Sequence, residues 1–333
     1  MEESEAGDSE SEQQGEEAET ENDGLEQQGD ESETENDESE QLIEDAEISG
    51  KCGDHLIWYY KNEVLYITGT GEMLDYDFRG DTDETDGFVC IYGTTTPWDD
   101  LHEKIDEIII DEGVTSIGKW AFYDCSNLTE ITIPEGVTSI GDNAFDDCSN
   151  LTEITIPEGV TSIGVNAFLG CSSLREITIP NSMTSIENGA FCGCSSLREI
   201  TIPEGVTSIE EYVFGSCSSL TEITIPEGVT SIGDWAFSKC SSLTEVTIPD
   251  SVTSIGCGAF SGCSSLREIT IPDSVTNIVD EDRYSWARNG SINLNIFDSC
   301  SDLTVYYSGN NLDEYINSYQ DEWNSNHITW IKQ

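Results

Sequence analysis

Apolar residues recur with a fixed period of 23 residues over most of the chain. The copy that begins at Leu128 reads "LTEITIPEGVTSIGDNAFDDCSN", with apolar side chains at its positions 1, 4 and 6. Positions 4 and 6 alternate with polar residues, which predicts a β-strand with one buried side. The opening leucine returns without a gap in seven successive copies, at Leu128, Leu151, Leu174, Leu197, Leu220, Leu243 and Leu266. We therefore expect one strand per copy and a parallel sheet from the stacked copies.

The remainder of each copy predicts a return path that closes a coil. Pro134 ends the strand because proline has no N–H to donate to a sheet, and Gly136 allows the turn after it. A second extended stretch then directs Val137 and Ile140 inward. The far side should hold a continuous buried column of rings, formed by Phe122, Phe145, Phe168, Phe191, Phe214, Phe237 and Phe260. Because a single copy cannot bury its own apolar face but a stack can, the pattern indicates a β-rich leucine-rich repeat solenoid.

Segments outside the regular copies indicate two caps. The solenoid is expected over residues 105–303, with an insertion that interrupts the register near its end. Residues 49–104 are interpreted as a β-hairpin capping module with "LIWYY" and "VLYITG" as its strands, since an open end would expose a bare sheet edge. Residues 304–333 predict an α/β C-terminal cap. Its helix is indicated by apolar residues at helical spacing, and its strand by "HITWIK"; the helical residues are Leu312, Ile316, Tyr319 and Trp323.

Acidic residues dominate the chain and are most concentrated at its start. The sequence holds 68 Asp and Glu against 12 Lys and Arg, a formal net charge of -56. That balance excludes a nucleic-acid binder, which needs basic patches, and electrostatic attraction to anionic membranes. Residues 1–48 carry few apolar side chains, so we expect a disordered acidic spacer, with a cation-binding segment or a partner-binding acidic arm as the alternative.

The sequence contains neither a secretory signal nor a run of about 18 apolar residues that would span a membrane. Met1 is followed by Glu2 and Glu3 rather than by a basic and then an apolar stretch. An acidic spacer directly after the start is typical of the segment that comes after a removed signal or lipid anchor, so we expect a processed or truncated start.

Twelve cysteines are present, and eight of them stand at position 21 of the copies: Cys125, Cys148, Cys171, Cys194, Cys217, Cys240, Cys263 and Cys300. Metal sites usually use two close pairs such as Cys-x2-Cys, whereas these residues come one per coil. We interpret them as buried structural thiols at the point where the chain turns back into the sheet. Cys192 and Cys194 form a lone Cys-x-Cys pair. Cys52 and Cys90 would bridge only in an oxidising compartment, and the sequence leaves that pairing open.

The repeated motif L-x-x-I-x-I-P-x-x-V-x-x-I-G-x-x-A-F-x-x-C resembles the leucine-rich repeats of BspA-like bacterial surface proteins over residues 105–303. The segment "CGDHLIWYY…LYITGTGEM…PW" is similar to the module that precedes such repeats in surface proteins of gut and oral anaerobes. The resemblance implies a curved solenoid at the cell surface or secreted, which adheres to host or bacterial proteins. It implies no enzyme activity.

Two groups of outward-facing residues are the candidate partner-binding sites. In every regular copy position 3 is glutamate and position 5 is threonine, and in three copies position 2 is arginine. The strand candidates are Glu130, Glu153, Glu176, Glu199, Glu222, Glu245, Glu268, Thr132, Thr155, Thr178, Arg175 and Arg198. The second group lies in an insertion near residues 279–292 and holds Tyr284, Trp286 and Arg288, residue types that are common at binding hot spots. The alternatives are a solvated face that only keeps the protein soluble and a tolerated surface loop.

Catalytic signals are missing from the sequence. The three histidines, His55, His102 and His327, lie outside the repeats and lack metal-ligand spacing, and no nucleophile or phosphate-loop motif occurs. We therefore predict a non-enzymatic protein without cofactor or metal. Its predicted function is adhesion to a host extracellular or bacterial surface protein through the solenoid face. The alternatives are a structural spacer or scaffold at the cell wall and a cation-binding surface protein.

Overall fold

The computed structural model describes residues 46–82, 89–278, 295–308, 312–318 and 327–333. By its internal contacts the chain divides into Met1–Glu44 and Asp45–Gln333, and all described ranges belong to the second unit. Most of the expected acidic spacer and the whole insertion at 279–292 therefore lie outside the described residues.

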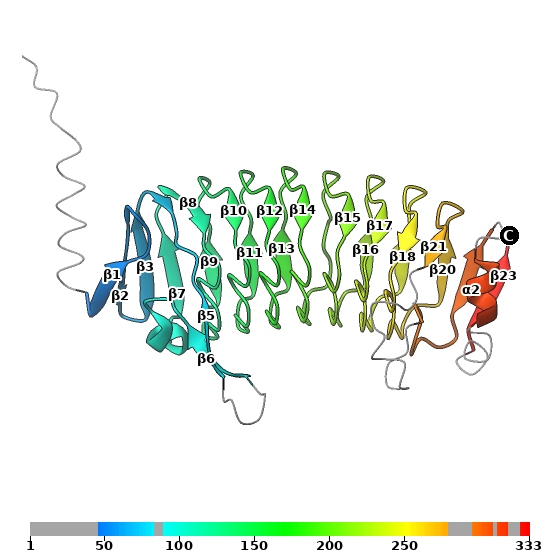
Figure 1. Cartoon of the computed structure of the whole chain (residues 1–333), viewed down its shortest axis with the longest axis horizontal. Coiled ribbons are helices and arrows are strands. Elements are labelled where there is room, and N and C mark those ends of the chain that lie inside the picture. The colour runs from blue at the N-terminus through cyan, green and yellow to red at the C-terminus, as the bar shows by residue number, and fades with distance from the viewer. Residues whose placement is uncertain (1–45, 83–88, 279–294, 309–311, 319–326) are drawn as a thin grey trace, which may run out of the picture. The chain divides into compact units, whose positions relative to one another are not determined.

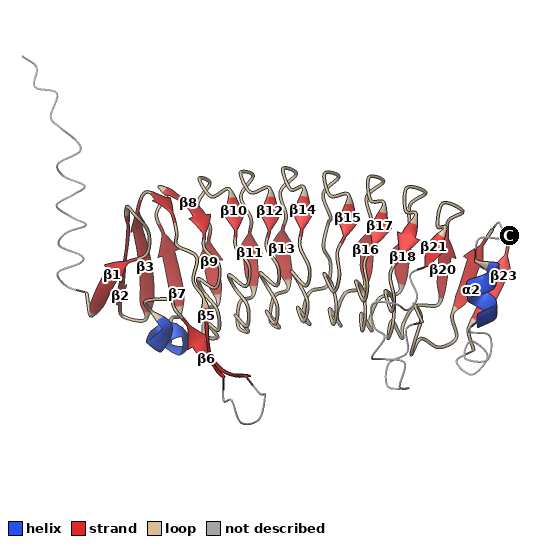
Figure 2. Ribbon diagram, in the orientation of Figure 1, coloured by secondary structure: helices blue, strands red, loops and turns tan. Residues whose placement is uncertain are grey.

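The first side of most coils is a short strand, and within each sheet it pairs in parallel with the strand of the neighbouring coil (Figures 1 and 2). In β9, Glu130 and Thr132 are exposed and Ile131 is buried, which is the predicted alternation. The register joins equivalent residues one period apart, so that Glu153 pairs with Glu130 and with Glu176. This row of strands consists of β7 (Glu107–Ile110), β9 (Glu130–Thr132), β11 (Glu153–Thr155), β13 (Glu176–Thr178), β16 (Glu222–Thr224), β18 (Glu245–Thr247) and β20 (Glu268–Ile271). The predicted parallel solenoid is confirmed.

The second side of the coil adds another row of strands, most of them two residues long. Val137 and Ile140 point into the core here, as the sequence predicted. Gly141 comes next because a Cβ at this position would lie 2.6 Å from the backbone nitrogen of Lys119 in the preceding coil. The row consists of β8 (Val114–Ile117), β10 (Ser139–Ile140), β12 (Ser162–Ile163), β14 (Ser185–Ile186), β15 (Ser208–Ile209), β17 (Ser231–Ile232), β19 (Ser254–Ile255) and β21 (Asn277–Ile278). Each regular coil therefore presents two strand sides and a third side built of turns.

The predicted phenylalanine column runs through the core behind the turn side. The centroids of Phe145 and Phe168 are 5.2 Å apart with ring planes 3° from parallel, and Phe191 and Phe214 are 5.8 Å apart. Phe297 continues the column beyond Phe260, at 6.0 Å. A tryptophan ends the column on each side, because Trp98 packs on Phe122 and Trp330 packs on Phe297. Stacked aromatic burial of this kind contributes strongly to core stability.

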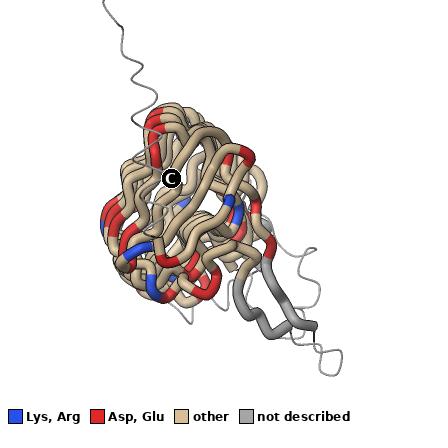
Figure 3. Tube along the Cα trace, turned by 90° about the vertical axis from the view of Figure 1, so that its left-hand side faces the viewer, with Lys and Arg blue, Asp and Glu red and all other residues tan. Residues whose placement is uncertain are grey.

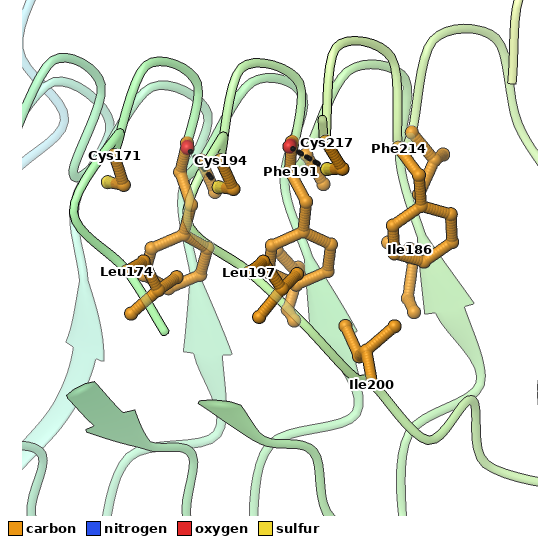
Figure 4. Packing of buried hydrophobic residues seen from close by; sticks show 14 of the residues in the cluster. Cys171, Leu174, Ile186, Phe191, Cys194, Leu197, Ile200, Phe214 and Cys217 are labelled. Atoms are coloured by element: carbon orange, nitrogen blue, oxygen red, sulfur yellow. Dashed lines mark hydrogen bonds between the residues drawn. The ribbon is translucent and has the colours of Figure 1, made fainter. Parts of the chain in front are cut away.

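The ladder cysteines are buried and hydrogen-bonded, which confirms their structural role. The thiol of Cys194 donates to the backbone carbonyl of Phe168 at 3.3 Å, and the thiol of Cys217 donates to that of Phe191 at 3.2 Å (Figure 4). The same carbonyl accepts the N–H of the cysteine in its own coil, as in Cys194 N to Phe191 O at 3.2 Å. Burial raises the pKa of the Cys240 thiol to about 12. The thiols from Cys148 to Cys300 therefore stay protonated, and each links its coil to the preceding one.

Replacing Cys171 by alanine should lower the free energy of unfolding by about 1–2 kcal/mol, because it leaves a cavity and removes a donor from the Phe145 carbonyl. Chemical denaturation of the full chain checks this value. Rapid labelling of the eight ladder thiols by a thiol-reactive dye in the native protein would contradict the burial on which the prediction depends.

The N-terminal cap continues the first strand row with antiparallel pairs. Strands β1 (Ile48–Lys51), β2 (Leu56–Lys61) and β3 (Val64–Gly69) form a meander, and β3 pairs in parallel with β7. The expected hairpin is confirmed, and Asn62 and Glu63 make its turn with positive φ. The cap also contains β4 (Gly71–Glu72), β5 (Phe78–Thr82), β6 (Val89–Thr94) and the 3-10 helix η1 (Asp99–Lys104). Cys52 is a buried free thiol, and the side chain of Cys90 lies outside the described residues.

The C-terminal cap pairs in parallel with the last coil. Strand β22 (Thr304–Tyr307) joins β20, and β23 (Thr329–Lys332) joins β22. Helix α2 (Asp313–Ser318) places Ile316 and Tyr315 against the core. The predicted helix and strand are both present, although Tyr319 and Trp323 lie outside the described residues.

The strand rows are interrupted between the coils that begin at Leu174 and Leu197. In this described part of the chain β13 and β14 are the last members of their sheets, and β14 does not pair with β15. On the turn side the coils remain joined, because Gly189 N donates to Glu211 O at 2.8 Å and Phe191 N donates to Val213 O at 3.0 Å. We attribute the interruption to two larger core residues. Met183 and Val213 stand where neighbouring coils have valine and alanine.

Backbone amides at this interruption should exchange with deuterium at least about tenfold faster than their equivalents one coil earlier. Thr184 N donates to Thr161 O and Glu187 N donates to Ile163 O, whereas the equivalent Thr207 and Glu210 amides have no such bond within the described coils. Hydrogen exchange read by mass spectrometry or NMR compares the two pairs. Equal protection would show that the strand rows are continuous in solution.

Candidate functional site

The exposed side of the first strand row is the surface that the sequence singled out. We call it the Thr/Glu face and define it by the position-3 glutamates and position-5 threonines, which are Glu130, Glu153, Glu176, Glu199, Glu222, Glu245, Glu268, Thr132, Thr155, Thr178, Thr201, Thr224, Thr247 and Thr270. All of these side chains are exposed. Within each sheet the register pairs like with like, so glutamates and threonines follow one another in two parallel columns with a step of about 4.8 Å between paired strands. The structure therefore brings the predicted strand residues together on one surface.

The position-2 threonines beside these columns link neighbouring coils by hydrogen bonds. Thr152 Oγ1 donates to the Thr129 carbonyl at 3.2 Å, and Thr244 Oγ1 donates to the Thr221 carbonyl at 3.1 Å. Arginine at this position cannot repeat that contact, and Arg175 and Arg198 stand on the two coils that flank the interruption. Both arginines line a shallow hollow with Glu176 and Glu199. Their guanidinium groups are thus available beside the acidic column.

The electrostatic character of the face is negative. In the described coils no ion pair within 4.0 Å joins Arg175 or Arg198 to a glutamate of the face. Lys and Arg are sparse around the stack, whereas Asp and Glu recur along several of its edges (Figure 3). Like charges one ladder step apart repel each other, so the face favours an approaching cation or basic group.

The threonine column ends in apolar residues that sequence reasoning missed. At the C-terminal end Tyr306 pairs with Thr270 and so takes the threonine position. At the N-terminal end the equivalent residue of β7 is Ile109, which is 39% exposed and pairs with Tyr66. The substitution was readable in "EIII", where regular copies have "EITI". An acidic strip is therefore flanked by apolar residues at both ends.

The structure adds no support for a binding site outside the Thr/Glu face at the other positions that the sequence indicated. Tyr284, Trp286 and Arg288 lie outside the described residues, so the insertion stays a hypothesis. Within the described ranges no group of three His, Cys, Asp or Glu side chains is placed to hold a metal ion. The helices that the structure describes are too short or too polar to cross a membrane.

Asp146 is a buried carboxylate on the turn side. Burial raises its pKa to about 7, and the neighbouring charges of Asp147 and Asp124 add to the shift. A folded-state pKa above the unfolded value of 3.8 means that ionisation opposes folding. The contribution of this residue to stability is therefore lost as the pH rises from about 4 through about 7.

Replacing Asp146 by asparagine should stabilise the protein at pH 8 by about 2–4 kcal/mol, because it removes a buried charge. The gain should shrink as the pH falls towards 4. Denaturation at pH 5 and pH 8 measures the difference, with Glu158→Gln as a control that removes an exposed charge. A gain that does not depend on pH would contradict the assignment.

Comparison with known proteins identifies the repeat. Residues 101–217 and 161–287 match the BspA type leucine rich repeat region, a unit of six copies. The chain belongs to this family. The match covers the Thr/Glu face, the phenylalanine column and the cysteine ladder from Cys125 to Cys263. It therefore confirms the resemblance on which the repeat assignment was based. Comparison with curated protein sequences gives no match.

Several solved structures of bacterial leucine-rich repeat proteins are similar to this chain. A leucine-rich repeat protein from Bacteroides ovatus is 26% identical, with 78% of this chain and 73% of that chain covered and a TM-score of 0.50. One from Eubacterium ventriosum is also 26% identical, with 79% and 72% covered and a TM-score of 0.48. A leucine rich cell surface protein from Faecalibacterium prausnitzii is 23% identical, with 80% of this chain and 90% of that chain covered and a TM-score of 0.31.

Proposed function

We propose that this BspA type protein is a non-enzymatic module at the cell surface that adheres to host extracellular or bacterial surface proteins. The observation that carries the proposal is the Thr/Glu face, a long set of exposed side chains held in register by a packed core. Family membership supports a protein-interaction or surface role.

The chemistry of the face indicates the kind of partner. Glutamates at single-strand steps present a row of carboxylates, which a partner with spaced lysines and arginines would complement. Threonine methyl and hydroxyl groups beside them supply small contacts for both apolar and polar atoms. Ile109 and Tyr306 at the two ends offer apolar anchors, which contribute more binding energy than exposed ion pairs. We therefore infer a basic, elongated protein surface as the partner.

Three glutamates of the face should carry a measurable part of the binding. The full chain is tested against a panel of immobilised extracellular matrix proteins and intact bacterial cells. The variant Glu153→Gln/Glu176→Gln/Glu199→Gln should weaken binding at least about tenfold and flatten its dependence on salt.

The matched control removes the same charge from the exposed corner of three coils, as Glu135→Gln/Glu158→Gln/Glu204→Gln. This variant should bind like the natural protein. The proposal fails if nothing in the panel binds at any ionic strength. It also fails if both triple variants lose affinity equally, since bulk charge would then explain the effect.

A further inference from the structure

Position 16 of each coil, on the turn side, has a left-handed backbone. Its φ is 54° at Asn143 and Asn166, 66° at Gly189 and 61° at Gly258. Asparagine and glycine adopt this conformation readily, whereas bulky side chains are strained there. Three coils nevertheless carry an aromatic residue at the position, which are Trp120 (φ 59°), Tyr212 (φ 58°) and Trp235 (φ 58°). Strained residues of this kind persist where another requirement holds them, so each needs a physical reason.

Trp120 has a structural reason. Its side chain packs against the hydrophobic core and meets Tyr123 edge-on, with ring centroids 5.3 Å apart. The other two aromatic residues do not share that setting. Tyr212 is 39% exposed, and Trp235 is half-buried without belonging to the side chains that pack against the core.

Tyr212 and Trp235 instead form a stacked pair on the outside of the turn side. Their ring centroids are 6.2 Å apart and the planes are 9° from parallel. The indole lies over Gly258, where any Cβ would clash with it. Neither the phenol oxygen of Tyr212 nor the indole nitrogen of Trp235 has a hydrogen-bond partner among the described residues. Hydrogen bonding within the described part of the protein therefore does not explain the choice of these two side chains.

On the other side of Tyr212 the position-16 column contains a glycine instead of an aromatic ring. The next position-16 residue there is Gly189, which has no side chain, and the one beyond is Asn166, whose Oδ1 lies close to where a Cβ on Gly189 would be. Two ladder steps, about 9–10 Å, separate the backbones of Asn166 and Tyr212, and the Asn166 amide extends over Gly189 into part of that distance. The half-buried thiol of Cys192 borders the same place, since its Sγ and the Tyr212 ring both lie within 3.4 Å of the Cβ site of Gly215.

The surroundings of the pair are acidic. Glu211 directly precedes Tyr212 and Asp234 directly precedes Trp235 in the chain. Burial raises the pKa of Tyr212, and the charges of Glu211, Cys257, Cys192 and Asp234 add to the shift. Asp234 is held in place because its Oδ1 accepts the N–H of Cys257 at 2.8 Å. Lys239 is the basic residue near the pair. Burial raises the pKa of the Cys192 thiol, and the positive charge of Lys239 opposes this larger effect by lowering it. A cation over an aromatic ring is attracted by the ring face, and guanidinium groups also stack on it.

We propose that the stacked rings of Tyr212 and Trp235 form a second contact site, which takes an arginine or lysine side chain from a basic segment of a protein partner. The proposal rests on the protein-binding function proposed above, but it places this contact on the turn side instead of the Thr/Glu face. Charge complementarity favours a basic group over a neutral sugar, which could also stack on exposed aromatic rings. The site accounts for aromatic residues at two positions where asparagine would fit without strain.

The variant Tyr212→Asn/Trp235→Asn tests the site in the full chain. Asparagine already occupies this conformation at Asn143 and Asn166, so the fold and the charge are kept. The probe is a fluorescein-labelled Gly-Ser peptide with three arginines, measured by fluorescence anisotropy in 150 mM salt. The control peptide carries citrulline, which has the shape of arginine without its charge.

We expect the natural protein to prefer the arginine peptide and the double variant to bind it at least about fivefold more weakly. The melting temperature of the variant should be unchanged or higher, because backbone strain is relieved. The proposal is overturned if affinity is unchanged, or if the variant melts several degrees lower and the pair is thus a packing element. Binding of maltotetraose without binding of the arginine peptide would also overturn it, in favour of a glycan site.

The Thr/Glu-face triple variant separates this proposal from the preceding one. It should keep most of its affinity for the arginine peptide in 150 mM salt if the aromatic pair is the contact. Loss of peptide affinity in that variant alone would assign the peptide to the Thr/Glu face and overturn the second site. Peptide binding at the pair, together with no binding to any matrix protein or cell, would leave the second site standing and reject the adhesion proposal.

Discussion

Each coil can bury its leucine, isoleucine and phenylalanine side chains only against the coils next to it. Two kinds of contact join neighbouring coils. One is the stack of rings from Phe122 to Phe297, and the other is the hydrogen bonds from cysteine thiols to phenylalanine carbonyls beside it. It also requires the caps, because the first and last coils would otherwise expose a ring face and a strand edge. Trp98 and Trp330 cover the two ring faces, and β3 and β22 cover the two strand edges.

The same constraint leaves the outward positions free. Residues at positions 3 and 5 contribute nothing to the core, so their chemistry can serve recognition while the register holds them in columns. Position 16 on the turn side is a second set of outward positions. Its left-handed backbone favours asparagine and glycine, so an aromatic residue there stands out as an exception. Residues that packing does not explain are therefore the candidates for recognition on this solenoid.

Much of the fold was predictable because its determinants are local and repeated. The strand at "EIT", the inward Val137 and Ile140, the ring column and the buried thiols all derive from one 23-residue pattern. The hydrogen bond from the Cys148 thiol to the Phe122 carbonyl was not predictable, because its two groups belong to different coils. The interruption after β14 depends on how Met183 and Val213 fill a shared layer, which no single copy reveals. At the site, the glutamate columns were predicted, whereas the apolar ends and the Tyr212–Trp235 pair were missed. The presence of asparagine or glycine at position 16 in four copies was the available signal for a left-handed backbone.

The central claim is that partners bind to the exposed side of the first strand row. Carboxyl footprinting with glycine ethyl ester and carbodiimide, applied to the full chain free and in complex with a bound matrix protein, tests it residue by residue. The account predicts that labelling of Glu130, Glu153, Glu176 and their equivalents falls on binding, while the corner glutamates Glu135 and Glu158 are labelled as before. Protection of the corner glutamates with an unchanged strand row would contradict it.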